Sequence, residues 1–231
     1  MTLTEELLRQ AALAAIKNAL SLHESAVLLA ENGKAPPAAA LAIIAEEEFA
    51  KAVLYTIAAA VPEQRPVLEA RLRDLRQHNV KHILTGMVDG AQIINSEGWL
   101  VARQEGYPVS AEEMLTDMFE TLVSSGIDEL ITPREKAKTF YSDIRKSLGL
   151  PWREHMLPSD PSKLKEVALY VDIVNGTLST PDRVGREAEW YIRGLEYFLR
   201  YFHTLPLVLE NDEQWADFAA RLRRTSTPEK K

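Results

Sequence analysis

One segment limits the folds open to this chain more than any other. It runs from Ala38 to Val61, between Pro36-Pro37 and Pro62, and it begins as an almost wholly apolar helix. A helix that is apolar on all sides must be surrounded by protein, so we place it in the middle of a helical bundle. Its longest uncharged stretch, Ala52 to Val61, is far shorter than the roughly 20 residues that a bilayer span requires. No membrane association is expected.

Charged residues interrupt this apolar helix. Glu46 to Glu48 and Lys51 lie in its middle, and a second helical segment, 71–82, carries arginines beside His78 and His82. An unpaired buried charge costs several kcal/mol at least, so charge on an apolar helix needs partners. We therefore expect the carboxylate–lysine cluster to face the arginine–histidine cluster. Pairing between Glu and Lys along one solvated helix face is the simpler alternative.

Composition excludes several classes of protein. The chain has 231 residues, no cysteine and a net charge of −7. Disulfides and thiolate zinc sites are impossible without cysteine, and a reducing compartment, the cytoplasm, is the expected location. The acidic, amphipathic start lacks the order of a signal peptide. The negative charge argues against broad binding to duplex DNA. The basic segment 71–82 can still contact a nucleic acid, or it can pair with the protein's own acids.

The remaining sequence is also helical, which makes the fold all-α. Helices are expected over about 3–31, 38–61 and 66–94, and their short connections favour antiparallel neighbours in a bundle. Capping boxes at Ser110 to Glu113 and Thr132 to Glu135 predict two peripheral helices within about 110–148.

C-terminal helices are expected over about 160–224. They comprise one from Pro161 to Asn175-Gly176, one of about 28 residues from Pro181, and a short one capped by Asn211. We take residues 1–225 as one domain and 226–231 as a polar tail.

Four short motifs occur in a recognisable order along the chain. They are Asn18-Ala19, Glu47-Glu-Phe-Ala-Lys51, His78-Asn-Val-Lys81, and Leu169-Tyr-Val-Asp172 followed by Pro181. With these motifs on helices of suitable length, the chain resembles the AbiV-type abortive infection proteins of the HEPN group. The resemblance spans about residues 8–205, and it implies an HEPN-like antiparallel helical bundle with additional C-terminal helices.

The resemblance also implies a function. Proteins of this kind act against phage infection, and we expect a homodimer triggered by a phage or host protein. Active HEPN proteins are ribonucleases that need no metal or cofactor, and their signature is an Arg and a His separated by four to six residues. Arg73 and His78 fit with four residues between them, Arg71 and His78 with six, and Arg76 and His82 with five.

Helix geometry separates the two arginines that could serve His78. Residues seven apart lie on one helix face, about 20° out of register, whereas residues five apart differ by about 140°. On a regular helix Arg71, His78 and His82 therefore form one stripe, and Arg73 points elsewhere. Arg73 remains a candidate if it meets His78 of a second subunit or if the helix is distorted.

The chemistry that suits these residues is attack of an RNA 2′-OH on its neighbouring phosphate. His78, near the ordinary histidine pKa of about 6.5, can move the proton, and Arg71 or Arg73 can hold the phosphate. Asn79 could orient the substrate. The supporting polar cluster would comprise residues of both helices: Glu47, Glu48, Lys51, Lys81 and His82.

Two other interpretations of His78 remain open. It can pair with Glu46 to Glu48 as part of a polar core, with no catalytic role. It can also bind a metal together with His82, since the two are four residues apart. The sequence contains no Glu-x-x-His pair, so the usual di-iron pattern is missing and no metal is expected.

Two functional classes follow from these residues. The first is a defence effector that cleaves RNA after infection. The second is a non-enzymatic HEPN-like module that blocks phage growth or translation by binding a protein. An arginine of the third helix within reach of His78 in an accessible cleft would favour the first.

Overall fold

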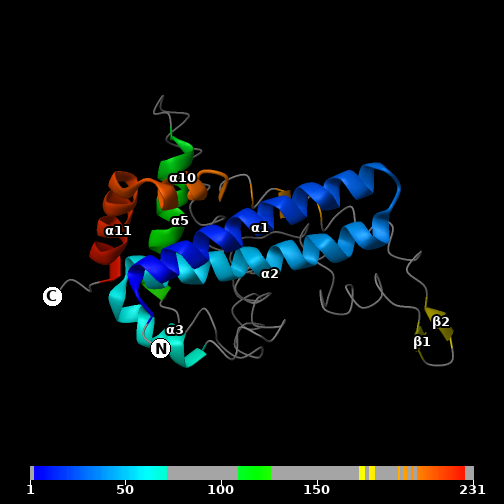
Figure 1. Cartoon of the computed structure of the whole chain (residues 1–231), viewed down its shortest axis with the longest axis horizontal. Coiled ribbons are helices and arrows are strands. Elements are labelled where there is room, and N and C mark those ends of the chain that lie inside the picture. Colours follow the sequence, from blue (N-terminus) through cyan, green and yellow to red (C-terminus); the bar gives the residue numbers. More distant parts are fainter. Residues whose placement is uncertain are drawn as a thin grey trace, which may run out of the picture.

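Two long helices, α1 (Glu5–Glu31) and α2 (Ala35–Ala60), form the central pair of the protein in the computed structural model (Figure 1). The structure describes residues 3–71, 109–125, 172–174, 177–179, 192, 195, 196, 199 and 202–226. The pair is antiparallel, because Glu5 at the start of α1 lies beside the residues that end α2. The predicted antiparallel packing of the first two helices is confirmed.

Local sequence signals set the ends of α1. Thr4 caps its N-terminus, where the hydroxyl accepts a hydrogen bond from the Leu7 N–H at 3.2 Å. At the other end the chain turns through Asn32, Gly33 and Lys34, and Gly33 has a φ of 71° that disfavours a side chain. The prolines that open α2 lie in its first turn, where a missing N–H costs nothing.

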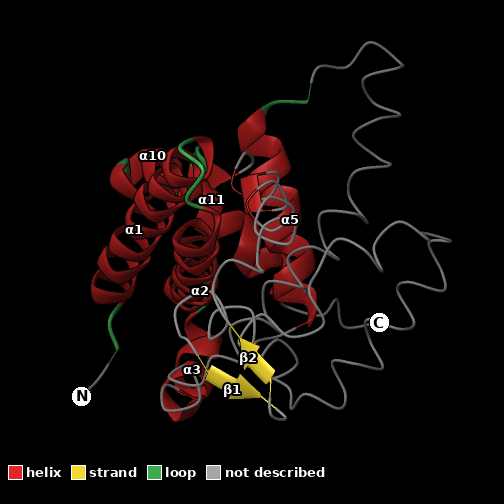
Figure 2. Ribbon diagram, turned by 90° about the vertical axis from the view of Figure 1, so that its right-hand side faces the viewer, coloured by secondary structure: helices red, strands yellow, loops and turns green. Residues whose placement is uncertain are grey.

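The second helix is the centre of the fold, as its composition predicts. Between Ala38 and Ala60 every residue is buried except for one partly accessible stripe: Leu41, Ile44, Glu48, Lys51 and Tyr55. In Figure 2, α2 lies between α1 and α5 (Ala111–Ser125). Within the described parts of the chain, no helix is long and apolar enough to cross a membrane.

An aromatic cluster joins the central pair to the later helices. Phe202 lies 4.5 Å from Phe49 of α2 and 5.8 Å from Phe119 of α5, measured between ring centroids. Phe119 in turn lies 5.3 Å from Phe218 of α11 (Asp212–Ser226). These edge-to-face contacts between buried rings hold α2, α5 and α11 around one core.

The predicted capping box at Ser110 is confirmed. Its backbone N–H donates to the Glu113 carboxylate at 2.8 Å, and its hydroxyl accepts from the Glu113 N–H at 3.1 Å. The helix that follows, α5, ends at Ser125 as expected. The second capping box, 132–135, lies outside the described residues.

The expectation of a helix up to Asn175 is wrong. The strands β1 (Asp172–Val174) and β2 (Thr177–Ser179) form an antiparallel hairpin, with Val174 paired to Thr177. Asn-Gly between two segments with β-branched residues favours a hairpin turn, and here this signal prevails over its other meaning, the end of a helix. This small hairpin apart, the described residues in regular elements are helical, and the all-α class is confirmed.

The long helix expected from Pro181 to about residue 208 is also wrong at its end. Residue 202 is helical, His203 and Thr204 form a turn, and α10 (Leu205–Glu210) begins anew. Pro206 explains the break, because its ring clashes with the carbonyl of the residue four positions earlier.

Asn211 caps α11 as predicted, and its side-chain oxygen accepts from the N–H groups of Glu213 and Gln214. The helix is longer than expected and includes Ser226.

The third helix is described only at its start. After the 3-10 turn η1 (Pro62–Gln64), α3 (Arg65–Arg71) leaves the corner at the end of α2 (Figure 1). The predicted start near Pro66 is confirmed. The rest of the predicted helix, residues 72–94, lies outside the described part of the chain.

Candidate functional site

The charged residues of α2 divide between two environments. Glu46 and Glu47 are buried, with 5% and 4% of their surface exposed. Glu48 and Lys51 lie on the partly accessible stripe of the same helix. The sequence left open whether the cluster faces inward or forms a solvated face. The structure assigns Glu47 to the interior and Glu48 to the surface.

Glu48 and Lys51 form an ion pair within α2, three residues apart. Their side chains are 19% and 27% exposed, so water screens the pair only in part. Tyr55 follows one turn later, and burial is the main cause that raises the pKa of its hydroxyl. The Lys51 charge opposes this shift and the Glu48 charge adds to it. The simple pairing expected along the helix is thus correct for Glu48 and Lys51.

Glu47 is the side chain best placed to support a site. It lies on α2, the most buried of the helices that the structure describes, where an ionised carboxylate needs a charged or hydrogen-bonding partner. The predicted partners, Arg71, His78 and His82, belong to the third helix. Contact between Glu47 and that helix stays a prediction, because the side chains that it invokes lie outside the described residues.

The catalytic candidates lie at or beyond the point where the description of α3 stops. Arg71 is its last described residue, helical as predicted, and its side chain is outside the described part of the structure. The remaining candidates also lie outside the described residues: Arg73, His78, Asn79, Lys81 and His82. The structure therefore fixes where the predicted catalytic helix starts.

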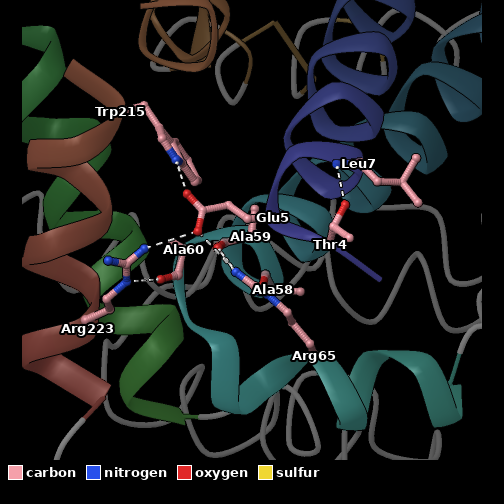
Figure 3. A network of polar contacts seen from close by, with 9 residues as sticks. All are labelled: Thr4, Glu5, Leu7, Ala58, Ala59, Ala60, Arg65, Trp215 and Arg223. Carbon is pink, nitrogen blue, oxygen red and sulfur yellow. Dashed lines mark hydrogen bonds and ion pairs between the residues drawn. The ribbon is translucent and has the colours of Figure 1, made fainter. Parts of the chain in front are cut away.

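A polar network holds that starting point (Figure 3). Arg65, the first residue of α3, donates from Nε to the Ala58 carbonyl and from Nη2 to the Ala59 carbonyl, both at 2.9 Å. Its Nη2 is also 3.3 Å from the Glu5 carboxylate at the start of α1. Arg65 thereby ties α3 to both helices of the central pair.

Two residues of α11 complete this network. Arg223 donates from Nε to the Ala60 carbonyl at 2.7 Å and lies 3.5 Å from Glu5 through Nη2. The indole N–H of Trp215 donates to the other Glu5 oxygen at 2.9 Å. Sequence reasoning missed this cluster. The only signal was that α2 has no basic residue in its last turn to bind its terminal carbonyls.

His23 of α1 is a buried histidine that contacts the later part of the chain. It is 8% exposed, and its Nε2 lies 3.3 Å from the Ile192 carbonyl, which fixes the later chain against α1. Burial lowers the pKa of the imidazole, and the hydrogen bond to Ile192 and the charge of Glu196 offset part of that effect.

Among the described residues, no group of three or more His, Asp or Glu side chains could hold a metal ion.

Comparison with known proteins decides the family. The model of the AbiV family of HEPN proteins matches residues 7–189. The chain belongs to the AbiV family. The resemblance carried by the four sequence motifs is therefore confirmed, and with it the assignment to the abortive infection antiphage proteins. No curated protein and no solved structure matches the chain. Helices α10 and α11 lie beyond the residues that the AbiV model matches.

Proposed function

We propose that this AbiV protein is a metal-independent ribonuclease that acts as a homodimer when infection triggers it. One observation carries the proposal: Glu46 and Glu47 are buried in the middle of a mostly apolar helix, and the sequence from Arg71 to His82 supplies arginines and histidines that could pair with them. A buried carboxylate at such a position is costly unless basic groups surround it. A histidine and an arginine held there are the groups that metal-free RNA cleavage needs.

The distances of Glu47 and His78 from the corner between α2 and the third helix support a contact between the two residues. Arg65 lies beside Ala58, and Glu47 precedes Ala58 by 11 residues, about 17 Å of helix. His78 follows Arg65 by 13 residues, about 20 Å on a continuous helix. If the third helix continues antiparallel to α2, as the sequence predicts, the two residues lie at about the same distance from the corner.

The roles of the residues follow from their chemistry. His78 would take the proton of the 2′-OH and return one to the leaving oxygen, and Arg71 would hold the phosphate as its charge develops. Glu47 would position His78 or Arg71 without touching the RNA. Arg73 would hold the phosphate instead if Arg73 of one subunit lies beside His78 of the second subunit in the dimer.

The test is the variant His78→Ala, with His203→Ala as its matched control on an exposed turn. Loss of general acid–base help typically lowers a rate by about 10²- to 10⁴-fold. We expect His78→Ala to lose RNA cleavage in vitro, toxicity to the host and protection against phage, with an unchanged circular dichroism spectrum. His203→Ala should retain all three activities, and a chelator should leave cleavage unchanged.

The opposite result identifies the non-enzymatic class. A folded His78→Ala protein that still protects cells would contradict the nuclease and favour a module that acts by binding. Comparing Arg71→Ala with Arg73→Ala in the same cleavage assay then identifies the arginine that holds the phosphate. Mixing His78→Ala with Arg73→Ala subunits tests the dimer, because only a site shared between subunits regains activity in the mixture.

A further inference from the structure

We infer that α11 is a strap that fixes the corner between α2 and α3, so that the direction of α3 depends on the docking of the C-terminal helix. The strap is defined by Trp215 and Arg223 of α11 together with their common partner Glu5 (Figure 3). The inference concerns the fold and stands apart from the reaction. The direction of α3 also sets the position of Arg71, its last described residue. A role of Arg71 in catalysis rests on the proposed function.

The corner needs donors that α2 does not supply. The last carbonyls of a helix lack partners within it, and a helix C-terminus attracts positive charge. The last turn of α2 contains no basic residue. Its three final carbonyls accept instead from two guanidinium groups, those of Ala58 and Ala59 from Arg65 and that of Ala60 from Arg223. One donor comes from α3 and the other from α11.

Glu5 couples the two arginines. Its carboxylate lies within 3.3 Å of Arg65 and 3.5 Å of Arg223, so the negative charge is shared between them. Without Glu5 the two guanidinium groups would repel each other at the same helix end. Docking of Arg223 therefore affects Arg65, the residue from which α3 starts.

The strap is attached at two points of unequal strength. Trp215 is 4% exposed and packs in the core with Phe218 and Leu222. Arg223 is eight residues further along, about 12 Å of helix, and its side chain is 45% exposed. Water can replace the Arg223 contacts without opening the aromatic core. The Arg223 end can thus release the corner while α11 stays bound through Trp215.

Hydrogen exchange measured on the full chain tests this inference. The variant Arg223→Ala removes the outer attachment, and Arg224→Ala, an exposed neighbour, is the matched control. Loss of one to two hydrogen-bonding contacts corresponds to about a 5- to 30-fold change in an opening equilibrium. We expect amides of residues 61–71 to exchange faster by that factor in Arg223→Ala, with amides of residues 12–19 in α1 unchanged. Arg224→Ala should change neither group.

Faster exchange confined to α11, or equal acceleration over α1 and the corner, would overturn the inference, since α11 would then act only on itself or on global stability. If Arg223→Ala does not fold, Arg223→Gln and Glu5→Gln replace it under the same criterion. The hydrogen-exchange result alone decides whether α11 fixes the corner between α2 and α3. RNA cleavage by the same variants tests the separate claim that Arg71 works in catalysis.

Discussion

The N-terminal helix pair and the C-terminal helices are built on different principles. In α1 and α2, neighbours in the sequence define the helices: Thr4 caps α1, Gly33 adopts the positive φ of the turn between them, and the apolar run of α2 makes it the buried helix.

 The C-terminal helices depend on residues far away in the chain, since Arg223 binds Ala60 and Trp215 binds Glu5. Local sequence therefore defines the first region, and tertiary contacts define the second.

The largest expected effect tests whether the two regions form one cooperative unit. Phe202 contacts Phe49 of α2 and Phe119 of α5, and it is fully buried. Phe202→Ala should lower the free energy of unfolding by about 3–5 kcal/mol, because it removes a large core side chain and leaves a cavity. Urea unfolding followed by circular dichroism measures this. The exposed Leu207→Ala is the control, and two separate transitions in the wild-type protein would contradict a shared core.

A second comparison lies within α2, between Glu47 and Glu48. Removing one partner of a buried ion pair typically costs about 3–5 kcal/mol, whereas a pair along one helix contributes about 0.2–0.5 kcal/mol. Glu47→Ala should therefore destabilise the protein far more than Glu48→Ala in the same urea titration. Equal, small effects would show that Glu47 has no charged partner in the interior.

The smallest expected effect is a pH dependence from His23. Burial lowers the pKa of this imidazole below its ordinary value of 6.5, so the unfolded chain binds the proton more readily than the folded one. Its contribution to stability is present above pH 6.5 and is lost as the pH falls below that value. One such site gives a slope of at most about 1.4 kcal/mol per pH unit. His23→Gln should reduce the slope between pH 7.5 and 5.5, and an unchanged slope would assign it to other groups.

The sequence predicted the parts of the fold that local chemistry determines. α2 ends before Pro62, and Ser110 and Asn211 cap α5 and α11, as expected. The start of α2 was expected after Pro36-Pro37, but the helix begins at Ala35 and holds both prolines in its first turn. The candidate cluster was predicted in part, because an apolar helix with carboxylates in its middle implies buried charge. Glu47 is buried accordingly.

The errors arose where a local signal has two meanings or where the partner is remote. Asn175-Gly176 can end a helix or turn a hairpin, and only strand pairing between residues 172–174 and 177–179 decides. The partners of Glu5 are 60, 210 and 218 residues away, at Arg65, Trp215 and Arg223. No periodicity within one helix can indicate contacts of that range.

The proposed site depends on a contact between Glu47 of α2 and His78 of the third helix. A double-mutant cycle with Glu47→Gln, His78→Asn and the combined variant, measured by urea unfolding, tests it most directly. Residues in contact show coupling of about 0.5–3 kcal/mol, whereas distant residues are additive within about 0.3–0.5 kcal/mol. We expect a coupling above about 1 kcal/mol between Glu47 and His78. Additive effects would contradict the contact and leave the proposed catalytic histidine without its buried partner.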